Sequence, residues 1–388
     1  MVTRRVKLSV LAVSAALAAS LAAAPSASAA SPHRQVPFGF MGVLTGAPLA
    51  EPGFQRTDSQ LRSMARAGVE SVRFAFYWDD AQPDGPESTN FDRTDRIVGA
   101  AARARIWILP TVLGAPRWAR ENPEHFASRP RDPEEYGRFM GVLVDRYGPH
   151  GSFWSEHPGL PRRPIRIWQA WNEPDHRNMW DEQPYYRAYI ATLKAARKTI
   201  LEHDPGAKVV LAGLVGRSWD QMSVLYRLGA GPNFDYAAVH PFTRFLPDVL
   251  RILRYVRTTM RRHGDGDKPM VATEVTWPSS KNRIRPASAF DRTELNQATL
   301  LTALFHTLAA QRTSLGLRAV YWATWSSRDR SRTDAFDYTG LTRLMPNGRL
   351  RRKPAFYSYR STARELQGCA KTTIATVCRP SPPARTAR

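Results

Sequence analysis

Eight short apolar runs recur along the chain, and segments with a helical pattern separate them. The runs are rich in Val, Ile, Phe and Trp, and they begin near Phe38, Val72, Ile106, Ile165, Lys208, Tyr236, Pro269 and Arg318. Some are almost continuously apolar, as in IWILP at residues 106–110, which is typical of strands buried on both faces. The runs therefore predict eight buried β-strands.

The intervening segments carry apolar residues at the spacing of one helix face. This pattern predicts helices over residues 59–67, 132–146, 185–203, 246–263 and 293–310. Alternation of strands and helices indicates a parallel sheet, because a parallel return needs a crossover helix. Eight such units in 388 residues predict an α/β fold, a (β/α)8 TIM barrel, as a single catalytic domain over residues 31–367.

The two ends of the chain differ from this pattern. Residues 1–30 combine a basic start, an Ala- and Leu-rich run and the tripeptide Ala27-Ser28-Ala29, which is the pattern of a secretory signal peptide. A membrane anchor is the alternative, but the run is short for a spanning helix. We expect a secreted, extracellular protein without membrane association after cleavage. Residues 368–388 are predicted to form a C-terminal tail in which Cys369 and Cys378 can oxidise to a bridge.

The chain is strongly basic, with a formal net charge of +22. Its arginines are spread along the whole sequence and form no single stripe with interleaved aromatic residues, so no nucleic-acid partner is predicted. Attraction of acidic polysaccharides and simple solubility both remain open as reasons for the charge. We expect a monomer.

Two predicted strands end in a carboxylate. The run from Ile165 ends in Asn172-Glu173-Pro174, and the run from Pro269 ends in Glu274. Catalytic groups of such barrels lie at the C-terminal ends of strands. A facing pair of carboxylates is what glycosidic cleavage requires, one to protonate the leaving oxygen and one to attack the anomeric carbon or activate water. Ion pairing with one of the many arginines is the competing explanation for each residue.

Trp171-Asn172-Glu173-Pro174 resembles the acid/base motif of clan A, the 4/7 superfamily of retaining glycoside hydrolases. In that clan the acid/base residue ends strand four and the nucleophile ends strand seven, so the resemblance assigns Glu173 as acid/base and Glu274 as nucleophile. It further implies that Arg73 pairs with the nucleophile, that Asn172 hydrogen-bonds the sugar 2-hydroxyl, that His240 lies near the nucleophile, and that Trp322 forms the floor of the first sugar subsite. Trp325 competes with Trp322 for that last role.

Within the clan, the pattern is most similar to glycoside hydrolase family 39, which includes β-xylosidases and α-L-iduronidases. This similarity rests on Gly39-Phe40, on His240-Pro241 and on the stretch from Tyr321-Trp322 to Gly340-Leu341. Other tryptophans that follow predicted strands are candidates for stacking on sugar rings, namely Trp118, Trp180 and Trp277.

No His/Cys cluster has metal-ligand spacing, and no nucleotide-binding glycine motif is present. We therefore expect chemistry without a metal or cofactor. The predicted function is a secreted retaining glycoside hydrolase that cleaves a poly- or oligosaccharide by double displacement, with Glu173 held protonated by the charge of Glu274. A non-catalytic carbohydrate-binding barrel at the cell surface and a basic adhesion protein are the alternatives.

Overall fold

The computed structural model describes residues 33–46 and 56–369, which belong to one compact unit. Eight parallel strands form its central sheet in the order β5-β4-β3-β2-β1-β8-β7-β6. Bridges from Val210 to Tyr236 and from Leu214 to Val239 join the two ends of this order, so the sheet closes into a barrel. The strands are β1 (Met41–Leu44), β2 (Ser71–Tyr77), β3 (Trp107–Leu113), β4 (Ile167–Ala170), β5 (Lys208–Val210), β6 (Ala237–Val239), β7 (Met270–Val275) and β8 (Leu317–Ala323).

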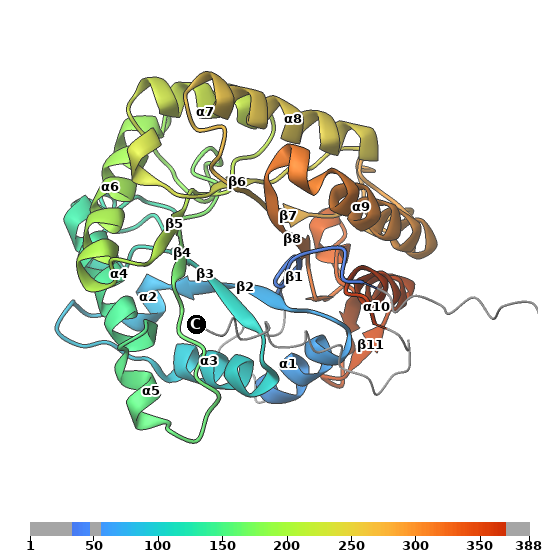
Figure 1. Ribbon diagram of the computed structural model, residues 1–388, viewed down its shortest axis with the longest axis horizontal. Helices are drawn as coiled ribbons and strands as arrows, with labels where there is room; N and C mark the ends of the chain where they lie inside the picture. The colour runs from blue at the N-terminus through green and yellow to red at the C-terminus, as the bar shows by residue number, and fades with distance from the viewer. Residues whose placement is uncertain (1–32, 47–55, 370–388) are drawn as a thin grey trace, which may run out of the picture. The chain divides into compact units, whose positions relative to one another are not determined.

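The strands lie in the middle and helices surround them (Figure 1). All five helices predicted from the sequence are present, as α1 (Thr57–Arg66), α4 (Pro133–Tyr147), α6 (Tyr186–His203), α8 (Leu246–Arg262) and α9 (Glu294–Leu315). The sequence analysis missed α3 (Asp92–Ala104), α7 (Ser218–Arg227) and α10 (Pro354–Leu366), and the short α2 (Trp78–Ala81) and α5 (Ser152–Glu156). The fold is therefore the predicted (β/α)8 barrel.

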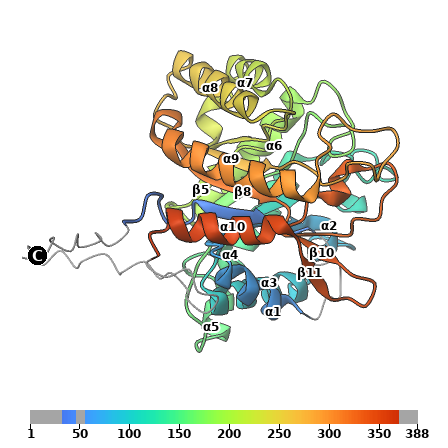
Figure 2. The ribbon, with the colours of Figure 1, turned by 90° about the vertical axis from the view of Figure 1, so that its right-hand side faces the viewer.

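Local sequence sets the ends of the longer helices. The Asp132 carboxylate accepts the backbone N–H of Glu134 at the start of α4, and Pro133 occupies the first turn. At the start of α9 the Thr293 hydroxyl accepts the N–H of Asn296, and Gly316 ends that helix in the left-handed conformation with φ 61°. Figure 2 shows α9 and α10 running side by side, and the two helices are in contact.

A small sheet that the sequence analysis did not predict follows β8. It contains β9 (Ser326–Ser327), β10 (Thr342–Leu344) and β11 (Leu350–Arg352). A buried ion cluster stabilises this sheet. Oδ2 of the buried Asp329 lies 2.7 Å from Nε of Arg343 and 3.5 Å from Nζ of Lys353. The cluster joins the segment after β8 to the start of α10.

A layer of apolar side chains fills the barrel toward the N-terminal ends of its strands. These are Leu109, Val210, Ala238, Val271, Ala319 and Tyr321, all less than a tenth exposed. Strands that fill the barrel in this way leave the opposite, C-terminal end for polar groups.

The predicted signal peptide of residues 1–30 and Cys378 lie outside the described residues. Among the residues that the structure does describe, no helix is both long and apolar enough to cross a bilayer.

Candidate active site

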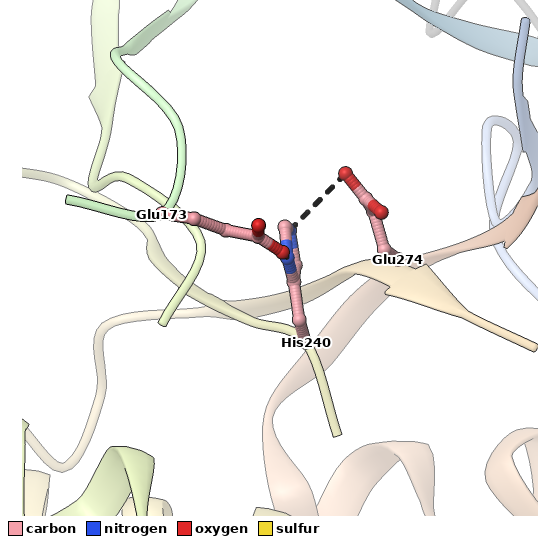
Figure 3. A group of neighbouring side chains, drawn as sticks. All are labelled: Glu173, His240 and Glu274. Carbon is pink, nitrogen blue, oxygen red and sulfur yellow. Dashed lines mark hydrogen bonds and ion pairs between the residues drawn. The ribbon is translucent and has the colours of Figure 1, made fainter. Parts of the chain in front are cut away.

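Four strands bring charged side chains to one end of the barrel. Glu173 follows β4, His240 follows β6, and Glu274 is the penultimate residue of β7. Arg73 comes from β2. In Figure 3 the carboxylate of Glu173 and that of Glu274 flank the imidazole of His240 from two sides. The two carboxylates singled out in the sequence thus lie together.

His240 contacts both carboxylates. Its Nδ1 lies 2.6 Å from Oε1 of Glu173, and its Nε2 lies 3.8 Å from Oε1 of Glu274. One carboxylate oxygen of each glutamate and one ring nitrogen of His240 all lie within 4.8 Å of one another. The imidazole is fully buried, whereas each carboxylate side chain is 15% exposed. A reactant entering the site therefore meets the carboxylates rather than the imidazole.

The guanidinium of Arg73 organises the other side of the site. Its Nη1 lies 2.6 Å from Oε1 of Glu274, its Nη2 donates to Oδ1 of Asn172 at 2.6 Å, and its Nε donates to Oε1 of Gln169 at 2.7 Å. Gln169 also accepts from Thr111 Oγ1 and donates to the backbone. A planar guanidinium can donate to several acceptors at once in a defined geometry. Arg73 therefore holds the side chains of Glu274 and Asn172 in fixed positions relative to each other.

Burial raises the pKa of the Glu173 carboxyl, but other groups outweigh it. The hydrogen bond from His240 and the positive charges of His240, Arg73 and His176 together lower the pKa of Glu173 below its usual value. The sequence-based expectation that the charge of Glu274 keeps Glu173 protonated is therefore wrong. The physical reason is the direct contact with His240, which the sequence resemblance placed near Glu274.

The backbone around Glu173 is unusual. Trp171 has φ 71° and Glu173 has φ 39°, both in a region that residues other than glycine rarely adopt. Strain of this kind clusters at functional sites, where the surrounding structure maintains it. Here Trp171 is buried, with its Nε1 donating to the carbonyl of Met179 and its ring packed edge-on against Trp180.

Gly213, beyond β5, makes room for the imidazole. A Cβ atom at this position would lie 2.1 Å from Nε2 of His240. Only a residue without a side chain therefore allows the ring to stand where it touches both carboxylates. Sequence reasoning missed Gly213 and Gln169, although each lies at or just beyond a strand end, which was the signal used for the glutamates.

A cavity of about 300 Å³ opens beside Glu274. Its lining includes the predicted Arg73 and Asn172, together with residues that the sequence analysis did not select, among them Tyr77, Asp79, Phe126, Trp171 and Met179. A cavity with one apolar wall and a few convergent polar groups suits an amphipathic ligand such as a sugar ring.

The tryptophans predicted to stack on sugar rings do not line this cavity. Trp180, Trp277 and Trp322 are no more than 1% exposed, and the indoles of Trp277 and Trp322 donate to the carbonyls of Thr243 and Thr339. Trp118 is half-buried and packs edge-on against Trp78. Trp171 is the tryptophan that lines the described cavity.

Glu173, His240 and Glu274 are also the group of described residues whose donor atoms are close enough to hold a metal ion. Their contacts fit a metal poorly. Nδ1 of His240 is already hydrogen-bonded to Glu173, and the Glu274 oxygen that faces His240 is the one paired with the Arg73 guanidinium. A cation placed there would compete with Arg73 for the same oxygen.

Fold and site together define a (β/α)8 barrel with a paired carboxylate site at its C-terminal end. No protein-family model matches the sequence, and no curated protein matches it. The structure is similar to a family 39 glycoside hydrolase from the gut symbiont Bacteroides cellulosilyticus WH2, with a TM-score of 0.62 and 17% sequence identity, covering 86% of this chain and 64% of that one.

A monomeric β-xylosidase from Caulobacter crescentus CB15 matches with the same TM-score of 0.62 and 17% identity, over 85% of this chain and 68% of that chain. An exo-β-1,4-mannosidase from Opitutaceae bacterium strain TAV5 has a TM-score of 0.56 at 17% identity, over 87% and 62% of the two chains. This chain spans about two thirds of the length of these proteins. The similarity to family 39 structures that the sequence indicated is confirmed for the fold.

Proposed function

We propose that the protein is a secreted retaining glycoside hydrolase, with Glu274 as the nucleophile and Glu173 as the acid/base. The observation that carries this proposal is the placement of one oxygen of Glu173 within 4.8 Å of one oxygen of Glu274 at the mouth of the barrel. Retaining enzymes hold their two carboxyl groups about 5–5.5 Å apart, whereas inverting enzymes need about 6.5–9.5 Å to admit a water molecule. The short separation supports double displacement.

In the first step an oxygen of Glu274 bonds to the anomeric carbon while the bond to the leaving oxygen breaks. Glu173, when protonated, gives its proton to that leaving oxygen. Arg73 holds the Glu274 carboxylate in place, so little reorganisation is needed during the reaction. The product of this step is a glycosyl ester on Glu274.

In the second step a water molecule gives a proton to Glu173 and attacks the same carbon. The bond from the sugar to Glu274 breaks, and two inversions give net retention. Asn172, held by Arg73 beside the nucleophile, is in place to hydrogen-bond a hydroxyl of the sugar in the cavity.

The substrate proposed is a carbohydrate of a poly- or oligosaccharide. Among the similar structures, one is named a β-xylosidase and another an exo-β-1,4-mannosidase, so xylosides and mannosides are the first to be tried. Secretion is proposed from the signal-peptide pattern of residues 1–30.

The test is hydrolysis of a panel of aryl glycosides and polysaccharides by the mature protein. Glu274→Gln is assayed beside it, and Glu202→Gln, at an exposed position of α6, serves as a matched control. Turnover of at least one substrate that is lost in Glu274→Gln and kept in Glu202→Gln is expected. Sugar binding without turnover in any member of the panel would favour a non-catalytic carbohydrate-binding barrel instead.

A further inference from the structure

A second and larger cleft, of about 970 Å³, lies outside the carboxylate site. It is formed by the segment between β6 and α8 and by the long segment between β7 and α9, near the starts of these neighbouring helices (Figure 1). Arg244 of the first segment follows His240 closely in the chain, and Lys281 of the second follows Glu274. At no more than about 3.6 Å per residue, the backbone of Arg244 lies within about 14 Å of that of His240, and the backbone of Lys281 within about 25 Å of that of Glu274.

The cleft is lined by four cations, Arg244, Lys281, Arg285 and Arg292. The one carboxylate in its lining, that of Asp291, accepts hydrogen bonds from the hydroxyl of Ser280 and, at 2.8 Å, from the backbone N–H of Ser288. No acidic side chain of residues 33–46 or 56–369 forms an ion pair with any of the four cations, although arginines such as Arg146 and Arg197 elsewhere are paired. The guanidinium of Arg292 donates to the backbone carbonyls of Arg244, Ala289 and Asp291, so the charges of Arg244, Lys281 and Arg285 are those available to an external anion.

A row of aromatic rings links this cleft to the carboxylate site. The ring of Phe242 lies 5.8 Å from that of His240, Phe336 lies 5.1 Å from Phe242, and Phe290 lies 6.5 Å from Phe336. Phe290 sits in the chain between two residues of the cleft lining, and Phe336 is 44% exposed. Aromatic faces of this kind pack against the apolar faces of sugar rings.

We propose that this cleft binds a segment of an acidic polysaccharide, one that carries carboxylate or sulfate groups, at a distance from the bond that Glu173 and Glu274 cleave. The proposal rests on the proposed function, because it requires a glycan bound at the carboxylate site to continue along the aromatic row into the cleft. Arg244, Lys281 and Arg285 contact the anionic groups of the chain, and the cleft selects charged over neutral polymers of the same backbone.

The experiment measures binding to polygalacturonate and to its methyl-esterified, neutral form. Every protein tested carries Glu274→Gln, so that turnover does not interfere. The cleft variant combines Arg244→Gln, Lys281→Gln and Arg285→Gln. The matched control removes the same charge from exposed positions on α1, α3 and α6, through Arg62→Gln, Arg96→Gln and Lys194→Gln. Thermal unfolding of both variants checks that each is folded.

We expect the Glu274→Gln protein to prefer polygalacturonate, the cleft variant to lose at least about fivefold in affinity for it, and the control to lose less than about twofold. Equal losses in the two variants would mean that overall charge alone attracts the polymer and would overturn the proposal. Equal binding of both polymers, or duplex DNA binding as tightly and with the same loss in the cleft variant, would also overturn it. Absence of hydrolysis by the unmutated mature protein, with this selective binding intact, would refute the proposed catalysis alone.

Discussion

At the scale of the residue, His240 lowers the pKa of Glu173, the proposed acid/base. Burial alone would raise the pKa of Glu173, and the hydrogen bond at 2.6 Å together with nearby positive charge reverses that direction. A general acid works only while it carries a proton, so the fraction of active enzyme falls as pH rises through the pKa of Glu173. We therefore expect hydrolysis to be fastest below neutral pH.

Replacing His240 with Gln should move the alkaline limb of the kcat/KM profile to higher pH. The variant loses the imidazolium charge, so burial becomes the dominant influence and the pKa of Glu173 rises. The measurement is the pH dependence of kcat/KM on one aryl glycoside, with thermal unfolding as a check on folding. An unchanged or more acidic limb would show that His240 does not control Glu173.

Gly213→Ala should reproduce part of this shift while the imidazole is kept. The new Cβ would overlap Nε2 of His240, so the ring must leave its contact with Glu173. Gly159→Ala, at a position where a Cβ meets nothing within 4 Å, is the matched control and should leave the pH profile unchanged. Identical profiles for both variants would contradict the role given to Gly213.

The sequence predicted the charged members of the site because strand ends converge at one face of a barrel. Glu173 and Glu274 were predicted from that rule, whereas Arg73 and His240 were predicted from the resemblance to clan A, and the structure brings the four together. Gln169 and Gly213 were missed, since their importance depends on which side chain stands opposite them across the barrel. The same applies to the pKa of Glu173, which depends on a contact between residues far apart in sequence.

At the scale of the element, two glycines let α4 pack closely against α6. Gly137 of α4 faces the backbone of Ala195 in α6, and Gly141 faces the side chains of Thr199 and His203. A Cβ at Gly137 would lie 2.9 Å from the carbonyl oxygen of Ala195, which belongs to the backbone and cannot turn away.

Two glycine-to-alanine substitutions in helices should therefore have opposite effects. Gly99→Ala in α3 introduces only ordinary contacts, at 3.5 Å and beyond, and should stabilise the protein by about 0.5–1 kcal/mol through helix propensity. Gly137→Ala gains the same propensity but forces α4 away from α6, and should destabilise by about 1–3 kcal/mol. Equal changes in unfolding midpoint in urea would refute this account of the packing.

The elements that the sequence predicted are those with a strong pattern. Buried strands read as continuous apolar runs, and helices such as α8 show a clear apolar face. Helix α3 was missed because Ala100, Ala101 and Ala102 form much of its buried face, and alanine gives a weak periodic signal. The strands β9, β10 and β11 are two or three residues long, too short for any period to be read.

At the scale of the whole molecule, the buried carboxyl of Glu70, directly before β2, makes unfolding depend on pH. Burial raises the pKa of Glu70 to about 7, against the opposing influence of Arg34, of the Gly39 N–H and of Arg318. The folded protein thus binds a proton more tightly than the unfolded chain does. Its contribution to stability is full below about pH 4.5 and is lost as pH rises through about 7.

The free energy of unfolding of the wild-type protein should therefore fall relative to that of Glu70→Gln between pH 5 and 8, by at most about 3 kcal/mol. Glu87→Gln, at an exposed position, is the control and should run parallel to the wild type. The measurement is urea unfolding across this pH range. A constant difference between wild type and Glu70→Gln would contradict the prediction.

The proposed mechanism requires that Glu274 forms a covalent bond to the sugar. To detect this bond, the mature protein is incubated with the 2-deoxy-2-fluoro analogue of the aryl glycoside it hydrolyses fastest, and the adduct is located by peptide mass spectrometry. We expect a single glycosyl group on the peptide that contains Glu274, and none on Glu274→Gln. Turnover of the parent glycoside with inversion and no adduct, or an adduct on another residue, would contradict this mechanism.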